Sequence, residues 1–107
     1  YEIMPSLVGS EMCIETVHLL SQKIIGDAGY GEYYGHGLGH GVGIDIHEKP
    51  VFGRTSNVVE AGAVITVEPG VYLPGVGGVR LEDYGVVTED GFDPFTTSTH
   101  ELVVIDC

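Results

Sequence analysis

The 107-residue chain has no tryptophan and few basic residues. Four lysines and arginines stand against sixteen aspartates and glutamates, so the formal net charge is −12. Nucleic acid is therefore a poor partner, because binding to phosphates depends on lysine and arginine. The surplus of carboxylates is typical of a soluble surface, and a bound divalent cation would offset part of it.

Long apolar segments and a cysteine framework are also absent from the sequence. No apolar run approaches the ~18 residues that span a bilayer, and no basic segment followed by an apolar stretch indicates a secretory signal. The two cysteines, Cys13 and Cys107, form neither a CxxC motif nor a disulfide framework. We therefore expect a cytoplasmic protein that does not bind membranes. The opening at Tyr1, without a start-like feature, indicates a piece of a longer protein.

Two hydrophobic periodicities predict an α+β fold. Apolar residues recur at three- and four-residue steps after Ser10, a suitable N-cap, which predicts an amphipathic helix over residues 10–28. Alternating patterns then predict short strands with loops between them. The predicted strands cover residues 39–47, 63–68, 78–88 and 101–106, and residues 48–62 are a predicted loop. Together they predict one helix followed by a curved antiparallel sheet.

Histidines are concentrated in a glycine-rich segment, residues 35–50. This segment holds three of the five histidines of the chain, namely His36, His40 and His47. Histidine is the commonest metal ligand and the usual acid or base near neutral pH. Glycines on both sides of His40 let the backbone approach closely and leave the imidazole uncrowded. The segment is therefore a candidate site for metal binding or catalysis.

Two carboxylates complete the candidate site. Glu68 is the last residue of a predicted apolar strand, a position where catalytic side chains often face a cleft. Glu82 shares a strand face with Arg80, whose guanidinium would keep the carboxylate ionised and aimed. One imidazole and two carboxylates suit Mn²⁺, Fe²⁺, Co²⁺ or Zn²⁺. The site forms if the strands that carry them converge, which spacing alone does not establish.

Each of these residues also has a structural interpretation. Glu68 is compatible with a surface position at a strand end, and Glu82 with an ordinary exposed ion pair to Arg80. We expect His18 on the surface of the helix and His100 in a structural role. The residues taken singly leave both interpretations open.

Three motifs, in order, resemble the pita-bread metallopeptidase superfamily. They are Gly35-His36-Gly37-Leu38-Gly39-His40 through His47-Glu48-Lys49-Pro50, then Thr66-Val67-Glu68-Pro69-Gly70-Val71-Tyr72, then Gly78-Val79-Arg80-Leu81-Glu82-Asp83. The extra His36 and the Arg-x-Glu-Asp motif resemble the proline-specific branch, which contains aminopeptidase P and prolidase. The resemblance covers about residues 24–106. It implies that residues 1–107 form the C-terminal half of a catalytic domain, with the ligand-bearing strands at about residues 39–106.

The resemblance also implies roles at a site with two divalent metal ions, Mn²⁺, Co²⁺ or Zn²⁺. It implies three metal ligands: His40, Glu68 and Glu82. Glu68 would also act as the general base, and Glu82 would bridge both ions. His36 and His47 would flank the substrate and stabilise the oxyanion, and Arg80 would support the ligand carboxylates. The implied reaction is hydrolysis of the bond between an N-terminal residue and proline.

Two ligands of the family pattern are missing from this sequence. The pattern has two aspartates well before the histidine segment, whereas Asp27 is the only aspartate before His36 and lacks their motif. We therefore expect at most one weak metal site and little activity from the isolated chain. Expected partners are a peptide with proline at its second position, and either the missing N-terminal half or a second copy, because uncovered sheet edges promote self-association. A non-catalytic protein-binding module and a creatinase-like hydrolase remain alternatives.

Overall fold

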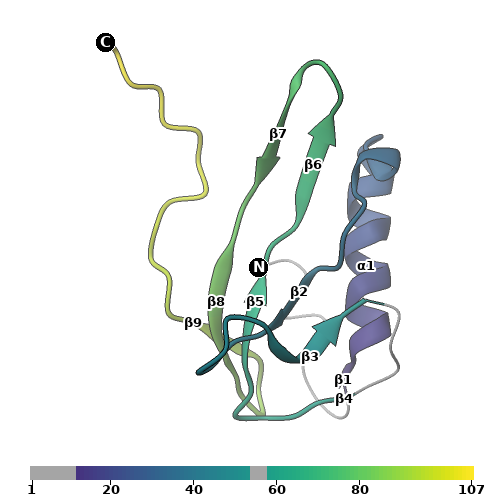
Figure 1. Cartoon of the computed structure of the whole chain (residues 1–107), viewed down its shortest axis with the longest axis vertical. Helices are drawn as coiled ribbons and strands as arrows, with labels where there is room; N and C mark the ends of the chain where they lie inside the picture. The colour runs from purple at the N-terminus through teal and green to yellow at the C-terminus, as the bar shows by residue number, and fades with distance from the viewer. Residues whose placement is uncertain (1–11, 54–57) are drawn as a thin grey trace.

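A helix lies along one side of an antiparallel sheet in the computed structural model, which describes residues 12–53 and 58–107 (Figure 1). The described elements are β1 (Met12–Cys13), α1 (Ile14–Asp27), the 3-10 helix η2 (Gly31–Tyr33), β2 (Gly39–Gly41), β3 (Glu48–Phe52), β4 (Val58–Val59), β5 (Val64–Val67), β6 (Gly70–Leu73), β7 (Gly77–Arg80), β8 (Asp83–Val87) and β9 (Phe92–Pro94). These elements confirm the α+β class. Within the two described ranges, no helix has the length and hydrophobicity to cross a membrane.

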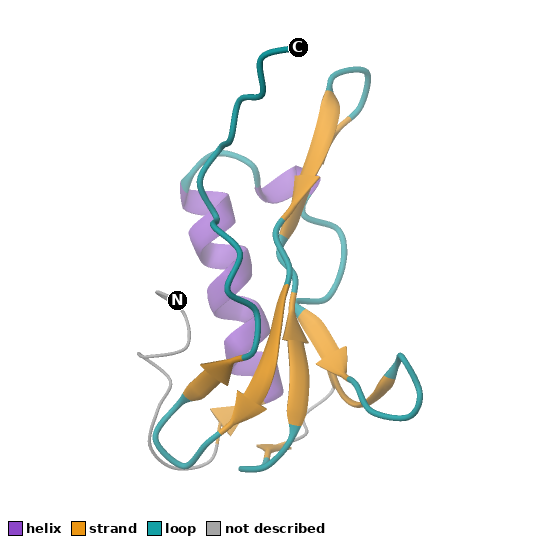
Figure 2. Ribbon diagram, turned by 90° about the vertical axis from the view of Figure 1, so that its left-hand side faces the viewer, coloured by secondary structure: helices purple, strands orange, loops and turns teal. Residues whose placement is uncertain are grey.

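The strands form one larger sheet and a projecting hairpin. The sheet has the order β3-β2-β5-β8-β9, and all of its described pairs are antiparallel. Strands β6 and β7 form a separate hairpin that extends beyond this sheet (Figures 1 and 2). The short strands β1 and β4 pair with each other near the start of α1. Chain segments far apart in sequence, such as β2 and β8, are therefore brought to the two sides of β5.

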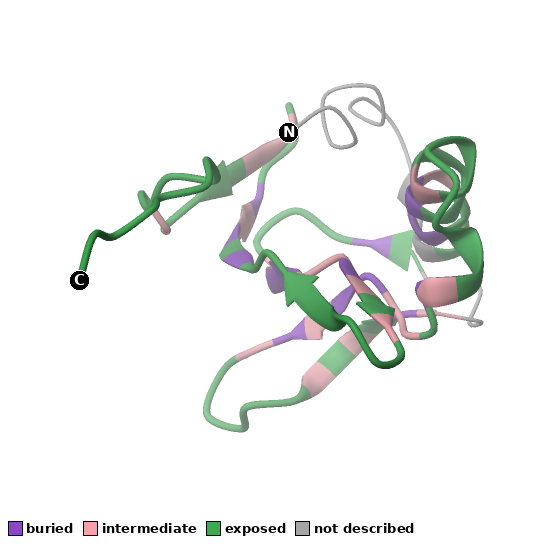
Figure 3. Cartoon of the chain, turned by 90° about the horizontal axis from the view of Figure 1, so that it is seen from above, coloured by how far each residue is buried: buried purple, intermediate pink, exposed green. Residues whose placement is uncertain are grey.

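The hydrophobic core lies between α1 and the sheet (Figure 3). Val17 of the helix is fully buried, as are Phe52 of β3 and Ile65 of β5. Because side chains alternate along a strand, Ile65 and Val67 enter the core while Thr66 points the other way. Burial of each large apolar side chain stabilises the fold by about 1.5–3 kcal/mol. The core thus leaves one side of β5 for polar groups.

The helix is shorter at its start than the sequence predicts. It begins at Ile14 rather than near residue 10, because residues 12–13 form β1 against β4. The predicted cap Ser10 lies outside the described residues. The predicted end is confirmed: Gly29 has a φ of 92°, and the Tyr30 amide donates to the Ile25 carbonyl at 3.1 Å, which closes the last turn.

His18 is buried, so the prediction of a surface position was wrong. Its exposure is 9%, and its ring lies 6.0 Å from that of Tyr34, which follows η2 and packs against the helix. The prediction used only the pattern of polar neighbours on the helix. It was wrong because the chain after the helix folds back over His18. His100, by contrast, has a structural contact as expected, because its Nε2 lies 2.5 Å from the Asp83 carboxylate.

The predicted strands differ from the observed ones where the chain changes partners. The strand predicted at residues 39–47 ends at Gly41, and residues 42–47 form a loop that leads into β3. The strand predicted at residues 78–88 is interrupted at residues 81–82, because β7 pairs with β6 whereas β8 pairs with β5. The loop predicted at residues 48–62 contains β3 and β4.

The C-terminal part of the chain also differs from the prediction. Residues 101–106 form no strand and are exposed, although they have the apolar pattern of a strand. The observed last strand is β9, which pairs with β8 and includes Pro94. Proline is tolerated there because β9 is at the edge of the described sheet.

Candidate active site

A cavity of about 390 Å³ lies on the side of β5 that carries Thr66. Its lining residues are His40, Val42, Ile46, His47, Thr66, Glu68, Arg80, Glu82 and Tyr84. They come from β2, the loop after it, β5 and the residue that follows it, the end of β7, the link to β8 and the start of β8. The cavity gathers every residue for which the sequence predicts a site role except His36. The strands that carry these residues therefore converge on one cavity, which the spacing of the residues alone did not establish.

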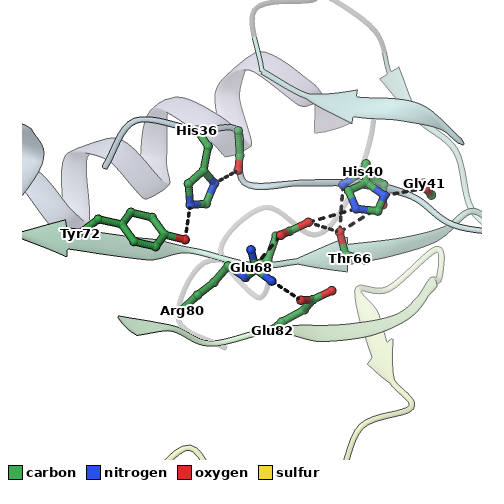
Figure 4. A network of polar contacts seen from close by, with 9 residues as sticks. His36, His40, Gly41, Thr66, Glu68, Tyr72, Arg80 and Glu82 are labelled. Atoms are coloured by element: carbon green, nitrogen blue, oxygen red, sulfur yellow. Dashed lines mark hydrogen bonds and ion pairs between the residues drawn. The ribbon is translucent and has the colours of Figure 1, made fainter. Parts of the chain in front are cut away.

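The central contact of the cavity joins His40 and Glu68. The His40 Nε2 atom lies 3.1 Å from Glu68 Oε1, and the two side chains are only 16% and 14% exposed (Figure 4). The other ring nitrogen, Nδ1, lies 2.8 Å from the carbonyl oxygen of Gly41. A carbonyl oxygen only accepts hydrogen bonds, so Nδ1 carries a proton in this contact. In the neutral ring, Nε2 then presents its lone pair to Glu68.

Thr66 holds both partners of this contact in place. Its hydroxyl accepts a hydrogen bond from the His40 amide at 3.0 Å and donates to Glu68 Oε1 at 3.0 Å. Thr66 and Glu68 lie two residues apart and therefore share one face of the strand. The sequence assigned Thr66 no role, because a threonine in a strand is ordinary in composition.

Arg80 lies between the two carboxylates of the cavity. Its Nε is 3.7 Å from Glu68 Oε2, and a terminal guanidinium nitrogen is 3.4 Å from Glu82 Oε2 (Figure 4). The Tyr72 hydroxyl, followed by the charges of Glu68 and Glu82, raises the pKa of Arg80 above its usual value. Arg80 is half exposed, so solvent weakens these ion pairs. This position is the one that a residue supporting both carboxylates requires.

His36 lies beside the cavity rather than in its lining. Its Nδ1 is 2.8 Å from the Gly37 carbonyl oxygen, and its Nε2 is 3.1 Å from the Tyr72 hydroxyl (Figure 4). Since Nδ1 must donate to the carbonyl, Nε2 of the neutral ring accepts from Tyr72. His36 is thus connected to Arg80 through Tyr72. The sequence predicted no role for Tyr72, although this residue lies in one of the motifs quoted for the family.

His47 approaches the site from the loop between β2 and β3. The centre of its ring is 4.4 Å from that of His40, and the two planes are inclined by 57°. The side chain is exposed, so it is accessible to a ligand in the cavity. His47 and His40 therefore lie on neighbouring parts of the cavity wall, whereas His36 does not.

The contact between His40 and Glu68 fits a divalent cation. Two acceptor atoms 3.1 Å apart repel each other unless a proton or a cation lies between them. Metal-bound histidines also donate their other ring nitrogen to a carbonyl or carboxylate, as His40 does to Gly41. An imidazole with carboxylates suits Mn²⁺, Co²⁺ or Zn²⁺. The donor atoms of His40 and Glu68 are therefore of the kinds that such a cation takes.

Glu82 is not joined to this pair in the structure. Its carboxylate faces Arg80 (Figure 4). Across residues 12–53 and 58–107, no three histidine, cysteine, aspartate or glutamate side chains are close enough together to hold a metal ion. The metal and catalytic roles of the six predicted residues stay predictions.

Known proteins provide an independent comparison. The model of metallopeptidase family M24 matches residues 3–89. A Xaa-Pro dipeptidase of Lactobacillus delbrueckii subsp. lactis is 53% identical over 87 residues, which cover 80% of this chain and 24% of that protein. The chain thus spans about a quarter of that relative, and less than a third of the two solved structures described next.

Solved structures agree with the fold. The X-Pro aminopeptidase of Thermotoga maritima MSB8 superposes with a TM-score of 0.88 at 33% identity, over 94% of this chain and 29% of that one. The Xaa-Pro dipeptidase of Bacillus anthracis superposes with a TM-score of 0.85 at 43% identity, over 92% of this chain and 28% of that one. These matches confirm the pita-bread fold and the resemblance to proline-specific peptidases. The chain belongs to metallopeptidase family M24.

Proposed function

We propose that this chain forms part of the active site of a metal-dependent exopeptidase that cleaves the bond between an N-terminal residue and proline. One observation carries the proposal: the His40 Nε2 and Glu68 Oε1 atoms lie 3.1 Å apart at the wall of a cavity. The similarity to Xaa-Pro dipeptidases supports the class of substrate. The substrate would be a dipeptide or longer peptide with proline at its second position.

Each residue of the cavity has a role in this proposal. A bound divalent cation, Mn²⁺, Co²⁺ or Zn²⁺, would polarise the scissile carbonyl and lower the pKa of the attacking water. His40, Glu68 and Glu82 would be ligands of such cations, and the complete site would contain two cations. Glu68 would also take a proton from the water and pass it to the leaving amine. Its Oε2 would take this proton, since Oε1 is engaged by His40 and Thr66, whereas Oε2 has only an ion pair with Arg80 Nε at 3.7 Å, beyond hydrogen-bond distance.

The remaining residues would orient the carboxylates and the substrate. Arg80 contacts Glu68 and Glu82 and would keep both ionised and aimed. His47, exposed at the cavity, would donate to the oxygen of the scissile carbonyl as negative charge develops on it. His36 would act from the side of Tyr72, which it contacts.

The isolated chain would be a weak metal-binding protein with little activity. It lacks the two upstream aspartates of the family pattern, and the complete site would require the other half of the domain or a second copy. The protein would act in the cytoplasm, in keeping with the absence of a cysteine framework.

A metal titration tests the ligand roles. Binding of Mn²⁺ to the 107-residue chain would be followed by electron paramagnetic resonance of the free ion. We expect Glu68→Gln and His40→Ala each to weaken binding by about tenfold or more, because each removes one of two facing donors. Glu60→Gln, at an exposed position outside the cavity, is the matched control. Equal binding by all of these variants would contradict the metal site.

An activity assay tests the reaction. The chain, and a longer polypeptide that supplies the missing aspartates, would be assayed with Mn²⁺ or Co²⁺ on Leu-Pro and Leu-Ala dipeptides. We expect turnover of Leu-Pro by the longer polypeptide and little turnover by the chain alone. Equal turnover of Leu-Ala would contradict specificity for proline, and rapid turnover by the chain alone would contradict its incompleteness.

A further inference from the structure

The loop that carries His47 is closed at its base by backbone pairing. Gly41 of β2 pairs with Glu48 of β3, and the register of the two strands shifts between His40 and Gly41. The Val42 amide still donates to the Val64 carbonyl at 3.0 Å, so the chain leaves the sheet only after residue 42. Residues 43–47 then form an exposed excursion. Its shape must come from contacts within the loop.

The Glu48 side chain provides such a contact. Although Glu48 belongs to β3, its carboxylate reaches back into the loop, where Oε1 accepts a hydrogen bond from the Asp45 amide at 3.0 Å. The Gly43 amide donates to the Asp45 carbonyl at 3.0 Å, which tightens the same turn. A Cβ atom at Gly43 would lie 2.6 Å from Glu48 Oε2 and 2.8 Å from Oε1. The carboxylate therefore occupies the space that a side chain at residue 43 would need.

The His47 ring depends on this loop for its position. Its ring centre lies 4.4 Å from that of His40, at the wall of the cavity. Within the described residues, no hydrogen bond or ion pair holds the His47 side chain. The backbone of residues 43–47 thus determines where the imidazole lies, and that backbone is bonded to Glu48 at its middle residue.

We propose that Glu48 is a positioning residue, whose carboxylate shapes the 43–47 loop and so holds the His47 imidazole beside His40. The use of this position in catalysis rests on the proposed function, whereas the positioning itself does not. What the loop needs from Glu48 is an acceptor oxygen at the Asp45 amide. Glutamine retains such an oxygen and alanine does not, so the two substitutions separate the hydrogen bond from the charge.

Nuclear magnetic resonance of the ¹⁵N-labelled 107-residue chain tests this role without metal or substrate. In the unmodified chain we expect a nuclear Overhauser effect between the His40 and His47 rings and a protected Asp45 amide. Glu48→Ala should remove the ring–ring effect and speed exchange of the Asp45 amide by about tenfold. Glu48→Gln should restore both signals. Resonances of Ser21 and Tyr34, at the helix, should not change in either variant.

Two glycine substitutions test the same role without relying on Glu48→Ala, which could also affect folding. Gly43→Ala keeps Glu48 but places a methyl group against its carboxylate, so it should reproduce the changes seen with Glu48→Ala. Gly35→Ala is the matched control, because a Cβ there meets no described atom within 4 Å. The proposal is overturned if the ring–ring effect survives Glu48→Ala or Gly43→Ala, or if Glu48→Gln loses it as well.

The experiments distinguish a failure of the proposed role of Glu48 from a failure of the proposed function. If the loop signals change as expected but Mn²⁺ binds independently of His40 and Glu68, the proposed function fails and the role of Glu48 stands. If Mn²⁺ binding requires His40 and Glu68 but the loop signals do not respond to Glu48→Ala, only the role of Glu48 is overturned.

Discussion

The two faces of β5 carry opposite kinds of residue although they share one short strand. On the helix side, Ile65 and Val67 are almost completely buried in the core. On the cavity side, Thr66 and the Glu68 carboxylate that follows contact His40. Because neighbouring residues alternate between these faces, stability and chemistry are encoded in alternate positions of the same segment. Substitutions on the two faces should therefore have separable effects.

The largest effect on stability is expected on the core side. Phe52→Ala removes a fully buried ring and should lower the free energy of unfolding by about 4 kcal/mol. Val79→Ala, on the exposed hairpin strand β7, should change it by less than about 0.5 kcal/mol. Urea titration followed by circular dichroism measures both. Similar losses in the two variants would contradict the location of the core.

A substitution between β2 and β5 should damage both faces together. A Cβ atom at Gly39 would overlap the Thr66 carbonyl oxygen and lie 2.7 Å from the carbonyl carbon. Gly39→Ala should therefore separate the strands, cost about 2 kcal/mol of stability and weaken Mn²⁺ binding through His40. Gly35→Ala is the control in the same denaturation and titration experiments. Unchanged stability in Gly39→Ala would show that the strands are less tightly apposed.

Thr66→Val tests the cavity side with almost no change in shape. It leaves the His40 amide without its acceptor and frees Glu68 Oε1, so we expect a loss of about 1.5 kcal/mol and weaker Mn²⁺ binding. Thermal and urea unfolding measure the first effect, and the Mn²⁺ titration measures the second. The exposed Thr88→Val is the control. A stable variant with unchanged Mn²⁺ binding would mean that the hydroxyl does not hold the pair.

The smallest effect concerns alkaline pH. Burial raises the pKa of the Tyr34 hydroxyl above its ordinary value of about 10, so the fold favours the protonated phenol. This contribution is fully present below pH ~10 and is lost as pH rises through the raised pKa, by at most about 1.4 kcal/mol per pH unit. Tyr34→Phe should remove this loss of unfolding free energy. Urea titrations of both proteins at pH 8 and above pH 10 measure it. Parallel curves for the two proteins would contradict it.

The sequence predicted the class of fold and the histidines, carboxylates and arginine of the cavity, but not its other lining residues or all of the contacts. Motifs around His40, Glu68 and Glu82 identify the strands that converge, since His40 lies within β2, Glu68 directly follows β5 and Glu82 directly precedes β8. The same patterns did not predict that the chain leaves the sheet after residue 42, because Val42, Ile44 and Ile46 alternate as a strand does. Apolar alternation indicates extended backbone, and the partner strand decides whether it joins a sheet.

The supporting residues were the harder part to predict. Thr66 and Tyr72 have common side chains, and their importance lies in which atoms come within 3.1 Å of them. The burial of His18 likewise depends on the chain after the helix, which returns through Tyr34. Local periodicity contains no information about such returning segments.

The register of the strand pairs β5–β8 and β6–β7 sets the positions of Glu68 and Glu82 relative to each other. Val67 lies opposite Asp83 in one ladder, and Gly70 lies opposite Arg80 in the other, so both ladders keep the same register across the interruption between them. Continuing that register places Glu68 opposite Glu82. The backbones at these two residues are thus held at the spacing of neighbouring strands, roughly 5 Å. Insertion of one residue into only one of the two paired segments would shift Glu68 and Glu82 out of register.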